Sequence, residues 1–521
     1  MENTSETDTV AAAQAAGRGK GRRNWSPTAI LLAIVVARLG FAALVFARPG
    51  LALANDTDRY VPIANGILSG TAYAWNTDRP GELLNTAGYP LFLAGVFAVG
   101  GSAPGAVALA QLLISGALAL AVYLVMRRAV GRPAAFIAAA ILALDPLGIL
   151  WSMTVLTETL LAVCLGLAAL VLVAWTSTLS TWRLILAGLL LGMACLVKPY
   201  ALLVAALWAI AILFFPFGGH GPRVGRLIHG LRQAGAFLLP IVVLVIPWVV
   251  RNALLWNCPT LSSVDRVTMR DYVAAKILQE TQGSSLDEAQ AQLRAQDPGV
   301  CPTDNVRYAS MIFANPGVYI KLHVAGTIPV LFGTNFDRWI EFFGVSYTFP
   351  DLWQPFMQGG LGGVVSVIVR ELFRFPAGPI LMVALILWQV VVYAMAVLGV
   401  LVYRRVMSWP IRWIIAVMTI SVLILVVTPG QGGNERFRVP VQPLLAILIA
   451  YGAACSVVPA FRGSASGCAD EGEQEQAGST GAPATRALDT MAARRTARSH
   501  IGSPGQSRAP DSQYCELSWI C

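Results

Sequence analysis

The chain has 521 residues, of which 56% are hydrophobic and only 12% are charged, and its mean hydropathy is +0.64. Because an ordinary soluble domain carries about 25% charged residues, this composition excludes a soluble enzyme. The formal net charge is +9, but the Lys and Arg residues stand in short clusters between apolar runs, where membrane orientation explains them. We therefore expect no nucleic-acid partner.

Apolar stretches long enough to cross a membrane recur along the chain. A hydrocarbon core about 30 Å thick needs about 20 mainly apolar residues per helix. These stretches predict helices at about 28–47, 104–127, 133–150, 153–176, 184–198, 200–217, 236–250, 376–403, 411–428 and 439–458. We expect an all-α polytopic membrane protein with about 10 to 12 transmembrane helices.

The basic residues of the short connections all fall on one side if the N-terminus is inside, and the positive-inside rule makes that side cytoplasmic. They are Arg127, Arg128, Arg132, Arg183, Arg223, Arg226, Arg232, Arg404, Arg405 and Arg412. Residues 1–27 are then a cytoplasmic segment and residues 28–458 the transmembrane domain. Residues 459–521 are rich in Gly, Ser, Ala, Arg and Glu, and are expected to form a disordered cytoplasmic tail.

The opposite face receives an outer loop at 48–103 and a long segment at 251–375, besides the short link 429–438. Within the long segment, residues 318–332 and 359–373 are apolar but short and interrupted by Gly, Pro or charge. We interpret them as interfacial helices, with a further pair of membrane crossings as the alternative. Residues 265–304 are expected to form a small solvated helical element.

Two cysteines share the outer face. Cys258 and Cys301 each precede a proline in a segment expected to meet an oxidising compartment, so either a disulfide or two unpaired thiols is possible. The chain has no zinc-like Cys/His spacing, and we expect no metal site of that kind. No cofactor is indicated, while a requirement for a divalent metal ion stays open.

The first outer loop offers the clearest candidate for acid–base chemistry. It reads NDTDRYVPIANGIL, which places Asp56 and Asp58 just beyond the first helix. A carboxylate at the membrane surface can take a proton from an acceptor hydroxyl. The alternative is a helix cap, because either side chain could satisfy the free N–H groups of an interfacial helix that starts there.

Further motifs follow in a fixed order. The loop continues to NTAGYPLFLAGVFAVGG, and later spans carry LDPLGILWSMTVLTE, GLLLGMACLVKPY, IPWVVRN and GGNERFRVPVQPLLAILIAYG. Together, over about residues 30–455, they resemble the GT-C glycosyltransferases of the protein mannosyltransferase and aminoarabinose transferase type, a family 39-like group. One departure is Ala87, where that family usually has proline before Gly-Tyr-Pro.

The resemblance implies a catalytic carboxylate four residues before a tyrosine in the first loop. Asp56 and Tyr60 match that spacing, so Asp56 is the first candidate for the base and Asp58 the second. The resemblance also implies a polyprenyl-phosphate sugar as the donor, whose phosphate needs a cation. The candidates are Arg436, Arg438, Lys198 and Arg251, although Arg251 could simply extend to the membrane surface.

Three further residues are expected at the cavity or the acceptor. Glu158 begins a span at the outer side, where it could orient a cation, bind the acceptor or favour the helix start. Tyr60 and Tyr89 belong to the first-loop motifs. The acceptor is expected to be an envelope lipid, glycan or protein, reached from a multi-pass position in the plasma or inner membrane with both termini cytoplasmic.

The function predicted from the sequence is therefore inverting transfer of a sugar from a polyprenyl-phosphate donor to an extracytoplasmic acceptor. Two alternatives stay open. One is a polytopic transporter or flippase of lipid-linked or polar substrates, and the other is a lipid-carrier ligase or polymerase that does not depend on Asp56. A missing internal repeat and the gathering of charged groups at one face favour the transferase.

The orientation is testable with three single-cysteine variants, Thr9→Cys, Asp287→Cys and Ser466→Cys. In intact spheroplasts we expect an impermeant thiol reagent to label position 287 and to leave positions 9 and 466 unlabelled until the membrane is opened, because the basic clusters belong inside. The reverse pattern would invert the topology.

Overall fold

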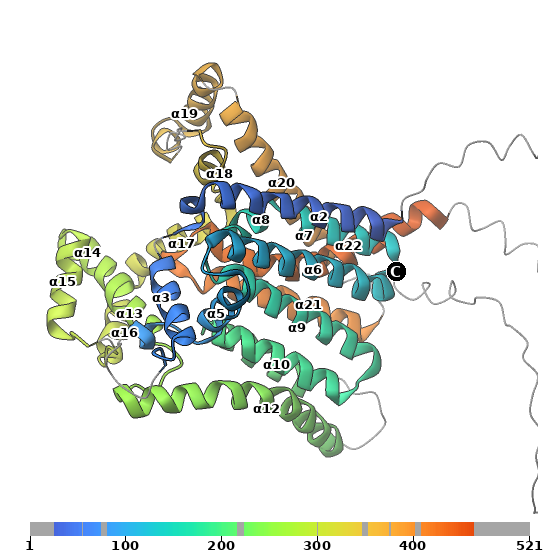
Figure 1. Ribbon diagram of the computed structural model, residues 1–521, viewed down its shortest axis with the longest axis horizontal. Coiled ribbons are helices and arrows are strands. Elements are labelled where there is room, and N and C mark those ends of the chain that lie inside the picture. Colours follow the sequence, from blue (N-terminus) through green and yellow to red (C-terminus); the bar gives the residue numbers. More distant parts are fainter. Residues whose placement is uncertain are drawn as a thin grey trace, which may run out of the picture.

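The computed structural model describes residues 26–54, 56–73, 81–215, 223–299, 301–345, 353–374, 377–401 and 408–462. Within these residues every regular element is helical. Figure 1 shows the long helices side by side along one direction, with the start of α2 and the end of α22 at the same end of the bundle. Apart from residues 26–27 and 459–462, the N-terminal segment and the C-terminal tail predicted above lie outside the described residues, as do positions 9 and 466.

Seven described helices are long and apolar enough to cross a membrane, the last counted together with the turn that precedes it. They are α2 (Pro27–Ala47), α6 (Pro104–Val130), α9 (Glu158–Thr178), α12 (Arg223–Trp256), α20 (Ala377–Leu401), α21 (Trp409–Val427) and α22 (Gln442–Arg462), preceded by the 3-10 turn η5 (Glu435–Val441). Helices α7 (Arg132–Leu144) and α8 (Pro146–Ser152) form a bent pair, at 48°, that adds an eighth span if it counts as one. The multi-span helical architecture is thus confirmed.

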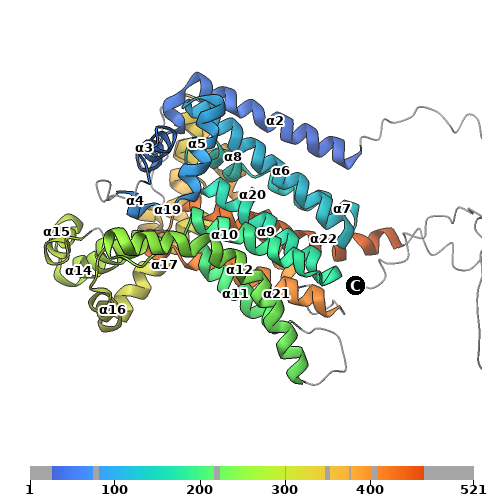
Figure 2. The same cartoon turned by 60° about the horizontal axis from the view of Figure 1, so that its bottom comes forward.

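Shorter helices complete the bundle and the end of it that carries α3. They are η1 (Pro49–Ala52), α3 (Thr57–Leu68), α4 (Gly81–Leu84), α5 (Gly88–Gly100), α10 (Thr181–Val197), α11 (Ala201–Leu213), α17 (Pro316–Phe332), α18 (Phe336–Phe342), α19 (Trp353–Arg374) and η4 (Gly430–Gly432). Figure 2 places α3, α4 and α5 together at the end opposite the start of α2. The two segments predicted to be interfacial, 318–332 and 359–373, are helical and belong to α17 and α19.

Several predicted boundaries are wrong. The helix expected at 236–250 spans Arg223–Trp256, so Arg226 and Arg232 lie within it, and the helix expected at 133–150 is broken at Asp145 into α7 and α8. The helix expected from residue 153 begins at Glu158, because residues 153–157 form a buried turn. Gln111 Nε2 donates to the carbonyl of Thr154 at 2.7 Å, and the N–H of Val155 donates to the carbonyl of Ala52 at 2.9 Å. These partners satisfy backbone groups that a continuous helix would have paired internally.

Helix α5, which was expected to be part of a loop, starts directly against the end of α10. A Cβ at Gly88 would lie 2.7 Å from the backbone carbonyl carbon of Leu196, a separation that real Cβ atoms do not show. Beside it, Thr86 Oγ1 donates to the carbonyl of Val197 at 3.1 Å. Only glycine permits this approach. The close contact constrains where the end of α10, and with it Lys198, lies relative to α5.

The predicted solvated element is helical and has a small apolar core of its own. It comprises α13 (Val264–Thr268), the π-helix η2 (Met269–Ala274), α14 (Ala275–Gln282), α15 (Leu286–Gln296) and α16 (Asn305–Ala314), with Leu278, Leu293 and Tyr308 in the core. We call it the outer helical unit. Both views show it at the bundle end that carries α3.

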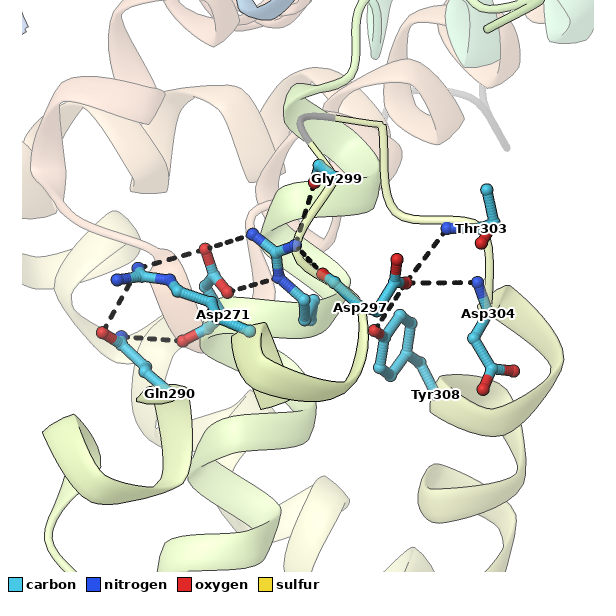
Figure 3. A network of polar contacts seen from close by, with 9 residues as sticks. Asp271, Gln290, Asp297, Gly299, Thr303, Asp304 and Tyr308 are labelled. Atoms are coloured by element: carbon cyan, nitrogen blue, oxygen red, sulfur yellow. Dashed lines mark hydrogen bonds and ion pairs between the residues drawn. The ribbon is translucent and has the colours of Figure 1, made fainter. Parts of the chain in front are cut away.

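A polar network ties the loop of the outer helical unit to its helices (Figure 3). Arg270 donates to both oxygens of Asp271, at 2.7 and 3.1 Å, and to the carbonyl of Gly299 at 3.0 Å. The Asp297 carboxylate accepts from the N–H of Thr303 at 3.0 Å and from the Tyr308 hydroxyl at 2.9 Å. These bonds and the apolar core hold the unit together, and Lys276 Nζ, which donates to the carbonyl of Gln431 at 3.1 Å, joins it to the helix bundle.

In the structure, Cys258 and Cys301 form a disulfide with Cα atoms 6.1 Å apart and a sequence separation of 43 residues. Closing a loop of that size should stabilise the outer helical unit by about 3 to 4 kcal/mol in the chain-entropy account. We expect alkylation of the native protein to modify neither residue before reduction, as measured by peptide mass spectrometry. Modification of both without reduction would contradict the bridge.

Candidate active site

Asp56 occupies the N-cap position of α3, yet its side chain makes no capping hydrogen bond. Its carboxylate instead pairs with Arg436, at 2.7 Å between Oδ2 and Nη1, and with Arg59, at 3.3 Å between Oδ1 and Nη1. The helix-cap alternative thus does not describe this side chain. Asp56 is turned toward a cationic cluster.

The pKa of Asp56 reflects this setting. Burial of the carboxyl by itself raises its pKa, but the charge of Arg436, with those of Arg59 and Lys198, outweighs burial and holds the pKa below its ordinary value. Asp56 is therefore ionised at neutral pH. Loss of its cationic partner would raise the pKa and make the carboxylate a stronger proton acceptor.

Glu158 holds two cations on the other side of Arg436. Its Oε1 atom lies 3.7 Å from Arg436 Nε and 3.7 Å from Lys198 Nζ, while the side chain is only 1% exposed. With Asp56 and Arg59, the cluster places three cations beside two carboxylates. These five side chains carry one excess positive charge, which suits an anionic ligand such as phosphate, and the carboxyl of Asp265 also lies within electrostatic reach of Lys198.

Several distant segments hold this cluster in place. Thr57, next to Asp56, donates through Oγ1 to the carbonyl of Val155 at 3.2 Å. Asn434 caps the turn that carries Arg436, accepting from its N–H at 3.2 Å. Lys198 follows directly on the end of α10 that Gly88 contacts. The site is thus assembled from the ends of α3, α9, α10 and η5.

Tyr60 and Tyr89 form an aromatic contact next to the charged cluster. Their rings are 5.1 Å apart in an edge-to-face contact. The Tyr89 hydroxyl donates to Gln111 Oε1 at 3.2 Å, and Tyr89 is fully buried. Tyr89 therefore positions Tyr60 and α3 and does not face a ligand, which differs from the cavity role expected for it.

Arg438 has partners that argue against the phosphate-binding role predicted for it. Its Nη1 donates to the carbonyls of Val330 and Leu331, at 3.2 and 2.8 Å, and its Nη2 to the carbonyl of Gly333, at 2.9 Å. Because the last carbonyls of a helix lack internal partners, Arg438 caps the end of α17. Its side of η5 faces that helix instead of Asp56.

Arg251 is likewise committed to a structural pair. Its Nη2 lies 2.7 Å from Glu82 Oε2, both side chains are at most 6% exposed, and Trp248 and Trp256 flank the guanidinium at 4.8 and 4.9 Å from their ring centres. The predicted donor-phosphate role for Arg251 is not supported. Instead, the pair joins α12 to α4.

Asp58 and Asp56 point in different directions, because residues two apart on a helix do not face each other. Asp58 is exposed and lines a pocket next to α3.

The sequence analysis missed Arg59 and Glu82. Only Arg59 could have been found from the sequence, because it stands three residues after Asp56, a spacing that brings two helical side chains together. Among the described residues no group of three or more His, Cys, Asp or Glu side chains could hold a metal ion.

These features define a multi-span helical membrane protein with a charged cluster at one end of its bundle, and comparison with known proteins agrees. Residues 85–249 match the family described as dolichyl-phosphate-mannose-protein mannosyltransferase. The predicted resemblance to GT-C enzymes of this type is confirmed over that stretch, which is less than half of the chain. No curated protein matches the chain.

Among solved structures, the chain is similar to the Archaeoglobus fulgidus oligosaccharyltransferase tethered to an acceptor peptide, with a TM-score of 0.43, 16% identity and coverage of 84% of this chain and 50% of that one. The oligosaccharyltransferase AglB of the same organism, in complex with an inhibitory peptide and a dolichol-phosphate, gives a TM-score of 0.43, 12% identity and coverage of 86% and 53%. The chain spans about half the length of these structures.

The buried Arg251–Glu82 pair gives a stability prediction. Glu82→Gln removes the carboxylate that Arg251 Nη2 contacts at 2.7 Å, and breaking a buried ion pair should cost about 3 to 5 kcal/mol. The exposed pair Lys321–Glu280, 2.9 Å apart, offers a matched control, since Glu280→Gln should cost about 0 to 1 kcal/mol. Thermal unfolding of the purified variants measures both. Equal midpoints for the two variants would refute the structural role of Arg251.

Proposed function

We propose that the protein is a membrane glycosyltransferase that moves a sugar from a polyprenyl-phosphate donor to an extracytoplasmic acceptor. The observation that carries this proposal is the contact between Asp56 and Arg436 at 2.7 Å, beside Lys198 and Glu158. It pairs a proton acceptor with cations fit for phosphate. The family match supports the same activity, and the matched stretch contains Glu158 and Lys198. It does not favour a transporter or flippase.

The chemistry would run in one displacement. A donor phosphate that binds Arg436 and Lys198 replaces Asp56 as the partner of Arg436, so Asp56 becomes a better base. The acceptor oxygen then bonds to the anomeric carbon and its proton passes to Asp56, while the carbon–oxygen bond to phosphate breaks with its electron pair on the phosphate. A single displacement inverts the anomeric carbon.

The cations stabilise the charge that grows on the leaving phosphate, and they are already placed when the reaction begins. Glu158 would act as a positioning residue, since it contacts both Arg436 and Lys198 at 3.7 Å and is almost fully buried. Its negative charge also compensates the cations before the donor arrives.

The membrane placement follows the same proposal. Helices α10 and α11 pack beside the spanning helices α9, α12 and α21, so we propose that they also cross, which brings the eight spans to about ten. The termini would lie in the cytoplasm of a cell with the site at the outer face of its plasma or inner membrane. Helices α17 and α19 would lie at the interface of that face.

Asp56→Asn tests the catalytic assignment, because asparagine keeps the size of the side chain and removes the base. We expect turnover to fall about a hundredfold to ten-thousandfold, while folding and donor binding persist. The measurement is release of polyprenyl phosphate from a panel of polyprenyl-phosphate hexoses and pentoses, with envelope extract as the acceptor source. Asp287→Asn, an exposed carboxylate at the start of α15, is the control.

Arg436→Ala should differ from Asp56→Asn in one respect. Because phosphate is the proposed partner of Arg436 in both the bound donor and the transition state, this variant should weaken donor binding as well as turnover. Near-normal transfer by purified Asp56→Asn protein would assign the first loop a structural role and reject the proposed base.

A further inference from the structure

A second polar site lies next to Asp56. A pocket with a volume of about 340 Å³ is bounded by α3 on one side and by residues 81–85 on the other. Small-ligand sites have volumes of about 300 to 1,000 Å³, so a single compact group fits. The proposed phosphate cations Arg436 and Lys198 do not line this pocket.

Arg59 connects the pocket to the proposed base. It lines the pocket, and its Nη1 also lies 3.3 Å from Asp56 Oδ1. A ligand held in the pocket therefore contacts a residue whose other partner is the catalytic carboxylate. An acceptor hydroxyl must come within hydrogen-bond distance of its base, and an acceptor held in this pocket would lie beside α3, the helix that begins at Asp56.

The pocket wall offers hydrogen-bond acceptors on one side and aliphatic surface on the other. Asp58 is exposed there, and no partner holds its carboxylate among the residues that the structure describes. The amide nitrogen of Asn85 donates to the carbonyl of Gly81 at 3.1 Å, which leaves its oxygen to accept. Pro62, Ile63 and Leu84 supply the aliphatic part.

We propose that this pocket is the acceptor site and that it takes a saccharide, an inference that rests on the proposed transferase function. A carboxylate with free lone pairs accepts from two sugar hydroxyls at once, and the C–H face of the ring packs on the aliphatic side. An extended peptide acceptor would need a strand edge or a long groove, whereas this pocket has a volume of only about 340 Å³ and is lined by α3 and residues 81–85. Asp58 thus binds the acceptor, whereas Asp56 is the base.

Binding without turnover tests the pocket directly. The full-length protein in nanodiscs, without donor, would be titrated with methyl mannoside and methyl glucoside and, separately, with a serine-containing tripeptide, using saturation-transfer NMR. Asp58→Asn should weaken binding of at least one glycoside about tenfold, the scale of a lost charged hydrogen bond. Asp287→Asn, which also removes an exposed carboxylate from the first turn of a helix, should leave it unchanged.

The inference is overturned if neither glycoside binds the unaltered protein, if Asp58→Asn binds as the control does, or if only the tripeptide depends on Asp58. Kinetics separate this inference from the function on which it rests. With a saccharide acceptor, Asp58→Asn should raise the acceptor KM and keep most of kcat, whereas Asp56→Asn should lose kcat. An unchanged acceptor KM beside an inactive Asp56→Asn rejects the pocket alone, and an active Asp56→Asn rejects the transferase mechanism.

Discussion

The ion pair between Asp56 and Arg436 joins residues that are 380 positions apart, and this contact constrains how the helices between them can be arranged. The membrane forces each connection between helices to one end of the bundle or the other. Charged groups from the first connection and from the last one therefore meet only if both lie at the same end. Their partners Arg59, Glu158 and Lys198 then compensate charges that would be costly to bury alone.

The contacts explain why the charged cluster can hold one more cation than it has carboxylates. Glu158 is almost fully buried and contacts two cations, and Asp56 contacts two as well. Each cation therefore keeps an opposite charge close by, although the cluster as a whole remains positive. Such a cluster is stable without a ligand and still attracts an anion, a combination that a neutral cluster does not offer.

The sequence could predict the helical spans, because runs of about 20 apolar residues are imposed by the thickness of the bilayer. It could also bring Asp56, Arg436, Lys198 and Glu158 to one face, since sidedness follows from the basic connections. It could not separate these from Arg251 and Arg438. Those two differ only in their partners, Glu82 and the carbonyls at the end of α17, which are far away in the chain and leave no pattern in it.

The stretch that matches a known family, residues 85–249, supplies Glu158 and Lys198 but neither Asp56 nor Arg436. The proposed base and the cation nearest to it thus come from outside the recognised part. The recognised part contributes the frame, namely the turn before α9 held by Gln111 and the contact between α5 and α10. The site is completed by Asp56 and Arg436, which lie outside the matched stretch.

Gly88 has a consequence for how this site can vary. Its Cα hydrogen meets the backbone at the end of α10, two residues before Lys198, and a methyl group would not fit there. Backbone cannot step aside as a flexible side chain can, so every replacement would push α5 away from α10. Because Lys198 follows two residues after Leu196, a displacement of α10 at this contact would also move the lysine relative to Glu158 and Arg436. A side chain at position 88 would therefore act on the charged cluster without touching it.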